Sequence, residues 1–67
     1  MAVLSVATKP DGDGGTYVLY LHADHNADVW HRKPGKPTYC LIGKQVMWKV
    51  RQEMAAHGIS ENDWSPG

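Results

Sequence analysis

Hydrophobic residues in the first two thirds of the chain come in short runs separated by turn-forming residues. The runs cover residues 2–8, 16–22, 29–32 and 38–42 and are rich in β-branched and aromatic side chains, a composition typical of strands. Segments rich in Gly, Pro, Asp and Asn lie between them, at 10–15, 24–28 and 34–37. The run at 16–22 is apolar on both faces, so we expect a central strand that is covered on each side.

After Gly43 the hydrophobic period changes from that of a strand to that of a helix. Residues 44–57 contain neither Gly nor Pro, and the apolar residues that recur four apart are Val46, Val50 and Met54. This spacing predicts an amphipathic helix over about residues 44–57, with these three side chains on its buried face. Gly58 is suited to end the helix.

The C-terminal residues carry a weaker signal. Ser60 and Asp63 have the spacing of a capping box, which predicts one short turn carrying Trp64. Ile59 is expected to fold back onto the helix. We expect residues 65–67 to fray.

The order of these elements predicts a small α+β fold. We expect an antiparallel meander of about four strands, followed by one helix that packs on one face of the sheet. With 67 residues the chain has room for one small core, so residues 1–67 are expected to form a single domain. Cys40 is the only cysteine, which excludes a disulfide within the chain and favours a reducing compartment.

Charged residues are segregated along the sequence, although the formal net charge is zero. Six of the seven Lys and Arg residues lie within 32–51, and no Asp or Glu lies between Asp28 and Glu53. Segregation of this kind bears on association with partners rather than on the fold. It favours a partner with an acidic surface, or a nucleoprotein complex.

The outer face of the predicted helix combines an aromatic residue with cations. On a helix that begins at Lys44, Trp48 lies away from the hydrophobic face, with Lys44 and Arg51 next to it. Trp and Arg are enriched in binding hot spots, so this face is a candidate binding surface. In the alternative interpretation, Ile59 or Trp64 folds back and covers Trp48.

The predicted turn at 32–36 presents three more cations just after Trp30. Such a turn can bind phosphates or an acidic protein surface, or it can simply protect and solubilise a sheet edge. Taken with the helix, it completes the set of predicted partner-binding residues: Trp30, Arg32, Lys33, Lys36, Lys44, Trp48 and Arg51.

Residue types suited to chemistry do not form a convincing catalytic group. No serine has the strand-to-helix context of an activated nucleophile, and Cys40 is expected to point inward, where a thiol is inert. His22, His31 and Cys40 offer zinc-type ligand atoms without zinc-type spacing, although a turn centred on 26–27 would place His22 opposite His31. The glycine-rich segment 10–15 lacks the remaining ligands of a calcium loop. We expect no enzyme activity and no cofactor.

Two resemblances guide the functional prediction. The order of elements from about Thr16 to His57 resembles that of the arm-type DNA-binding domains of phage integrases, which read DNA with their sheet. This resemblance implies direct nucleic-acid binding through the basic segment 29–52. In size and general build the chain is also similar to small phage-encoded inhibitors of host nucleic-acid machinery, including anti-CRISPR proteins, which implies an inhibitor or adaptor.

We therefore expect a small non-enzymatic protein-binding module that acts by covering its partner's surface. Direct nucleic-acid binding is the first alternative, although dedicated nucleic-acid domains are usually strongly basic overall. Metal binding through His22, His31 and Cys40 is the second. No apolar stretch approaches the roughly 20 residues of a membrane helix, and residues 1–7 do not resemble a signal peptide. We expect a cytoplasmic protein, in a bacterium or a phage-infected host, with no membrane partner; pairing with a second copy remains open.

Overall fold

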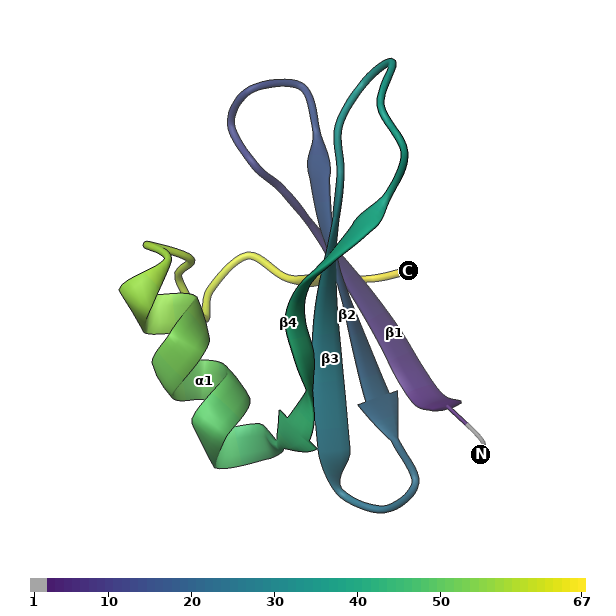
Figure 1. Cartoon of the computed structure of the whole chain (residues 1–67), viewed down its shortest axis with the longest axis vertical. Coiled ribbons are helices and arrows are strands. Elements are labelled where there is room, and N and C mark those ends of the chain that lie inside the picture. Colours follow the sequence, from purple (N-terminus) through teal and green to yellow (C-terminus); the bar gives the residue numbers. More distant parts are fainter. Residues whose placement is uncertain (1–2) are drawn as a thin grey trace.

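The computed structural model describes residues 3–67 and contains an antiparallel sheet with a helix on one face (Figure 1). Its elements, in chain order, are β1 (Val3–Pro10), β2 (Thr16–His22), β3 (Asn26–Arg32), β4 (Tyr39–Val46), α1 (Met47–Ala56) and β5 (Ser65–Pro66). The strands lie in the order β4-β3-β2-β1-β5, so β1 to β4 form a meander. The predicted α+β fold class is confirmed.

The strands lie where the hydrophobic runs predicted them. The observed and predicted strands differ mainly in the residues at which they begin and end. β2 covers the predicted residues 16–22, whereas β3 begins at Asn26 instead of residue 29. The turn before β3 is tight because His25 adopts a φ of 66° and its amide donates to the His22 carbonyl at 3.2 Å. The predicted first strand also included Ala2, which lies outside the described residues.

The largest difference from the sequence prediction is at the junction of β4 and α1. Gln45 and Val46 pair with Ala27 and Asn26 of β3, so this part of the chain is strand rather than the first turn of a helix. Two register shifts in the β3–β4 pairing are β-bulges, which bend a strand and increase its twist. The bent strand leads directly into α1, which therefore covers Met47–Ala56 rather than residues 44–57.

The core lies between α1 and the sheet. Its buried side chains are Ala27, Val29, Ile42, Val50, Met54 and Ile59. Val50 and Met54 belong to the predicted helix face, whereas Val46 precedes the helix and is 41% exposed. After Gly58, with φ 74°, the amide of Ile59 donates to the Met54 carbonyl at 2.8 Å. This C-terminal cap turns the chain back and buries Ile59.

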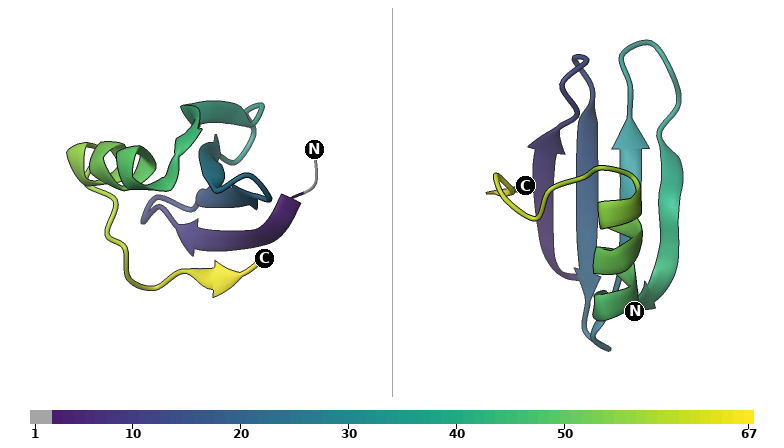
Figure 2. Two further views of the ribbon diagram at one scale, coloured as in Figure 1. Left: turned by 90° about the horizontal axis from the view of Figure 1, so that it is seen from below. Right: turned by 90° about the vertical axis from the view of Figure 1, so that its left-hand side faces the viewer.

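The C-terminal segment crosses from the helix to the far edge of the sheet (Figure 2). Residues 61–63 form bends instead of the predicted helical turn. The ammonium group of Lys9 donates to the carbonyls of Ser60 and Asn62, each at 2.7 Å, and so ties this segment to β1. Residues 65–66, for which the sequence predicted fraying, pair with β1 as β5.

The helix covers only one face of the sheet (Figure 2). Side chains alternate between the two faces of a strand, so Tyr17, Leu19 and Leu21 of β2 pack toward the core. Val18 and Tyr20 point to the opposite side, where no helix or further strand of residues 3–67 packs, although Val18 itself is only 7% exposed. The apolar pattern of β2 predicted that other elements would pack on both faces of this strand. The helix packs on one face only.

The central position of Val50 leads to a stability prediction. Val50 is 0% exposed, so Val50→Asp would place an unpaired carboxylate in the core, at a cost of about 3–5 kcal/mol. A core this small supplies only about 3–5 kcal/mol in total, so we expect the variant to lose its circular dichroism signal and its thermal transition. Gln52→Asp, on the exposed side of the same helix, is the control and should melt near the wild type. A wild-type melt for Val50→Asp would contradict this packing.

Candidate functional site

The residues predicted to bind a partner lie in separate parts of the structure. One group, at the tip of the β3–β4 hairpin, consists of Arg32, Lys33 and Lys36. A second group, on α1, consists of Trp48 and Arg51. The hairpin tip and the start of α1 lie toward opposite ends of the molecule (Figure 1). Trp30 lies on β3, with its side chain on the face opposite the helix. The seven predicted residues therefore do not form one continuous patch.

Lys44 differs most from its predicted environment. It lies on β4, and its Nζ is 3.1 Å from Oδ2 of Asp24 in the β2–β3 turn. The prediction that Lys44 lies one helical turn before Trp48 is wrong, because α1 begins only at Met47. The cation near Trp48 is instead Lys49, whose Nζ lies 5.6 Å from the centroid of the indole ring, within the range of a cation–π contact.

Trp48 is solvent-exposed on the outer face of α1. It is 59% exposed, and its neighbour Val46 is 41% exposed. Ile59 is buried in the core and Trp64 packs against the core, so neither covers Trp48. A large aromatic side chain exposed to this degree, with an apolar neighbour and a nearby cation, has the composition of an interface hot spot.

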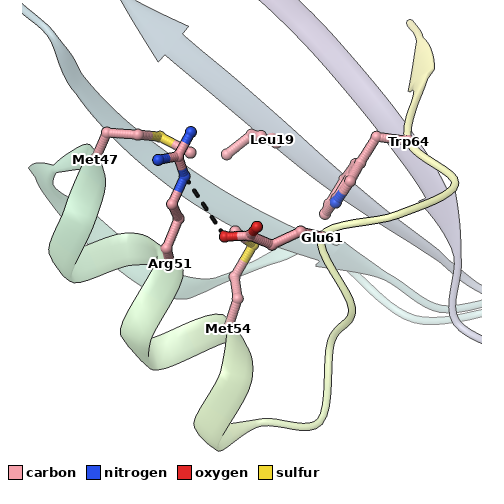
Figure 3. A pocket seen from close by; sticks show the side chains of 6 residues that line it. All are labelled: Leu19, Met47, Arg51, Met54, Glu61 and Trp64. Atoms are coloured by element: carbon pink, nitrogen blue, oxygen red, sulfur yellow. Dashed lines mark ion pairs between the residues drawn. The ribbon is translucent and has the colours of Figure 1, made fainter.

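A pocket of about 230 Å³ opens between α1, the sheet and the C-terminal segment (Figure 3). Its lining is Leu19, Met47, Arg51, Met54, Glu61 and Trp64. Four of these side chains are apolar or aromatic, and the two charged ones face each other, with Nε of Arg51 3.6 Å from Oε1 of Glu61. The pocket can accept a small apolar group, with a cation and a carboxylate at its side.

The Arg51–Glu61 ion pair is well suited to exchange. The two side chains are 59% and 66% exposed, and exposed ion pairs contribute only about 0–1 kcal/mol. An external carboxylate can therefore replace Glu61 at little cost. Nothing in the sequence indicated that Glu61 and Trp64 line a pocket, because their position depends on the path of the chain after the helix.

A second polar cluster lies at the other end of the sheet, around His31, which is 7% exposed. Its Nε2 lies 2.7 Å from Oδ2 of Asp11 and its Nδ1 lies 3.0 Å from the Tyr39 hydroxyl. The ring of Tyr17 packs on the imidazole, with 4.5 Å between ring centroids. The cluster connects the β1–β2 loop to three strands.

Asp11 is the centre of that loop. Its Oδ1 accepts hydrogen bonds from the amides of Asp13 and Gly15, at 2.7 and 2.8 Å. Gly15 is required here, because a Cβ at this position would collide with the Asp11 carboxylate and the Arg32 carbonyl. The glycine-rich segment 10–15 is thus ordered by one buried carboxylate. A carboxylate, an imidazole and a hydroxyl are also the residue types of a catalytic triad, in which the carboxylate orients the imidazole. Here the pocket lies elsewhere, and the contacts hold the β1–β2 loop against the strands.

The three residues of the zinc hypothesis do not converge. His31 lies opposite Tyr17 rather than His22, and His22 pairs with Asp28 at 3.3 Å on the other face of the sheet. Cys40 is exposed rather than turned inward, although partial burial of its thiol and the charge of Asp28 raise the pKa of Cys40. Within residues 3–67 no three His, Cys, Asp or Glu side chains are arranged to hold a metal ion.

No protein-family model matches the sequence, and no curated protein or solved structure gives a significant match. None of the helical segments in the described part of the chain has the length and hydrophobicity needed to cross a membrane.

The environment of Asp11 predicts how stability depends on pH. The hydrogen bond from His31, and then the backbone amide of Asp13, hold the pKa of Asp11 below its ordinary value of 3.8. A carboxyl group with a lowered pKa in the folded state stabilises the fold above its unfolded pKa, and this contribution is lost as the pH falls through the folded pKa. We expect the urea midpoint to fall below about pH 4.

Asp11→Asn separates this effect from that of the other carboxylates. The variant should be less stable than the wild type at pH 6, and the difference should shrink steadily as the pH is lowered toward 2. The measurement is a series of urea titrations between pH 2 and 6. A constant difference across this range would show that Asp11 does not carry the acid sensitivity.

Proposed function

We propose that the chain is a small non-enzymatic protein-binding module, an inhibitor or adaptor that acts by covering part of its partner's surface. The observation that carries this proposal is Trp48, which is 59% exposed on a helix whose opposite face is fixed in the core. An aromatic anchor on a rigid element loses little conformational entropy when it binds. We call the surface formed by Val46, Trp48, Lys49, Arg51 and the adjacent pocket the helix site.

The helix site offers three kinds of contact to a partner protein. Trp48 and Val46 supply exposed apolar area. The pocket, about 230 Å³ in volume, receives an apolar side chain. Arg51 exchanges its contact with Glu61 for a carboxylate of the partner, and Lys49 adds a second cation. This combination fits an acidic protein surface with an exposed hydrophobic residue.

The cellular setting is part of the same proposal. An acidic surface attracts the cations of the helix site, and we propose that a protein of the host's nucleic-acid machinery carries such a surface. An inhibitor of such machinery, encoded by a phage and active in the host cytoplasm, needs neither a catalytic group nor a cofactor. It needs only a rigid, correctly charged surface.

Trp48→Ala combined with Arg51→Glu tests the helix site. We expect at least a 30-fold loss of affinity, because truncating a central aromatic anchor costs about 2 kcal/mol or more and the new glutamate repels an acidic surface. The partner is first captured from nuclease-treated host lysate and identified by quantitative mass spectrometry. It is then purified and titrated against both proteins by calorimetry.

Lys33→Glu is the matched control, because it makes the same change of charge at the hairpin tip, away from the helix site. It should bind the partner with an affinity close to that of the wild type. Both variants should keep the wild-type circular dichroism spectrum, since neither Trp48 nor Arg51 is buried. A folded double variant with unchanged affinity would locate the binding surface elsewhere.

The alternative is that the hairpin tip binds nucleic acid directly. The observation that favours it is that Arg32, Lys33 and Lys36 form no ion pair within residues 3–67. Three cations at one tip are suited to contact phosphates. The adjacent β1–β2 loop weakens this case, because it brings Asp13 to the same end of the molecule; Gly14 in that loop lies next to Pro34 of the tip.

A salt series distinguishes the two functions. If the three tip cations each neutralise a phosphate, affinity for nonspecific duplex DNA should fall about 40-fold between 50 and 200 mM salt. Replacing Arg32, Lys33 and Lys36 together by Glu should then abolish DNA binding. The protein-binding function predicts no measurable DNA binding by fluorescence anisotropy, and no effect of the triple variant on the affinity for the protein partner.

A further inference from the structure

No element of residues 3–67 covers the face of the sheet opposite α1 (Figure 2). We call this surface, to which four strands contribute, the open face; its main residues are Val6, Val18, Tyr20, Trp30 and Cys40. Val18 is buried at its base, Val6, Tyr20 and Trp30 are partly exposed, and Cys40 is exposed. They are neighbours by register, since Val6 pairs with Tyr20, and Trp30 lies between Val18 and Cys40. Trp30 is only partly buried, although it lies near the middle of this surface.

Opposite charges flank Trp30 on the same strand. Asp28 and Arg32 precede and follow Trp30 by two residues on β3, and side chains two apart on a strand lie on the same face. Asp28 is 3.3 Å from His22, yet its Oδ1 and both ring nitrogens of His22 are buried without a hydrogen-bond partner in the described part of the chain. Arg32 is exposed and forms no ion pair there.

We infer that the open face binds the open face of a second copy of this chain. A two-fold axis through Trp30, lying between the sheets and perpendicular to the strands, reverses the direction of β3 in the second copy. Arg32 lies two residues after Trp30 and Asp28 two residues before it. Each Arg32 therefore lies over Asp28 of the other copy. One self-complementary surface therefore forms two ion pairs, as an isologous dimer requires.

The same symmetry positions the hydrophobic residues. Trp30 of one copy packs on Trp30 of the other at the centre, with Val18 and Tyr20 around it. Face-to-face sheets pack about 10 Å apart. Each Cys40, which lies next to Trp30 in the register, therefore faces Cys40 of the second copy across this layer. Within residues 3–67 of one chain, the only ion pair of Asp28 is its 3.3 Å contact with His22, and Arg32 of the second copy adds a cation to this site.

The size of the open face sets the expected strength. Strands of seven or eight residues, at about 3.3 Å per residue and 4.8 Å between strands, give a face of roughly 25 by 15 Å. This is about half of the roughly 800 Å² per partner that standard interfaces bury. An interface of this size belongs to the weak, transient class, so the dimer requires concentrated protein to be observed.

Analytical ultracentrifugation of the full chain between 5 μM and 1 mM tests the proposal. The wild type should change from monomer to dimer over this range. Arg32→Glu places like charges over each other at both ends of the interface, so we expect dimerisation to weaken at least tenfold. Lys33→Glu is the matched control, with the same change of charge one residue further along and outside β3; it should dimerise like the wild type.

Charge reversal also allows a rescue. Asp28→Arg combined with Arg32→Asp exchanges the two charges and should restore the dimer that Arg32→Asp alone loses. If the double variant does not fold, cross-linking supplies a second measurement. Cys40 is the only cysteine, so a bismaleimide with a spacer of about 8–10 Å should join two wild-type chains and join Arg32→Glu chains far less.

Three results would overturn the dimer. These are a wild-type monomer at 1 mM, equal weakening by Arg32→Glu and Lys33→Glu, and no dependence of cross-linking on Arg32. The Trp48→Ala, Arg51→Glu variant should still dimerise, because the helix site lies on the other side of the sheet. The dimer and the binding of a different protein can therefore succeed or fail separately.

Discussion

The burial of one face of α1 against β3 and β4 is the interaction on which the rest of this structure depends. Val50 and Met54 contact a sheet surface formed by Ala27, Val29 and Ile42, and together they form nearly all of the fully buried core. One helix of ten residues can cover only part of one face of a sheet. The same packing that stabilises the chain therefore leaves an uncovered sheet face, an exposed outer helix face and a gap beside the helix.

The absence of a loop between β4 and α1 determines which side chains face solvent. Because the strand continues to Val46 and the helix begins with the next residue, the strand and helix share one rigid junction. This fixes Trp48 on the second residue of the helix, pointing outward, and keeps Lys44 on the strand with Asp24. A flexible connection would let Trp48 turn toward the core.

The sequence predicted the fold class, the centre of the helix and the strand at 16–22, because these depend on local hydrophobic period. It did not predict features that depend on distant contacts. The β-bulges of β4 form against β3, the last strand exists only through pairing with β1, and Asp11 is ordered through His31, twenty residues away. The exposure of Trp48 was left open for the same reason, since it depended on where Ile59 and Trp64 pack. The pocket likewise forms only because the C-terminal segment passes beside α1, which brings Glu61 close to Arg51.

The helix site and the open face lie on opposite sides of the sheet, and this has a consequence for binding. In the proposed dimer the two sheets face each other, so both helices point outward and each helix site remains accessible. Two sites on one particle increase apparent affinity only when the partner presents two copies of its own surface at a matching distance. A repetitive partner, such as a protein assembled along a nucleic acid, meets that condition, whereas a monomeric partner does not. The weak self-association inferred from the small open face would then act as a selector for assembled targets over free subunits.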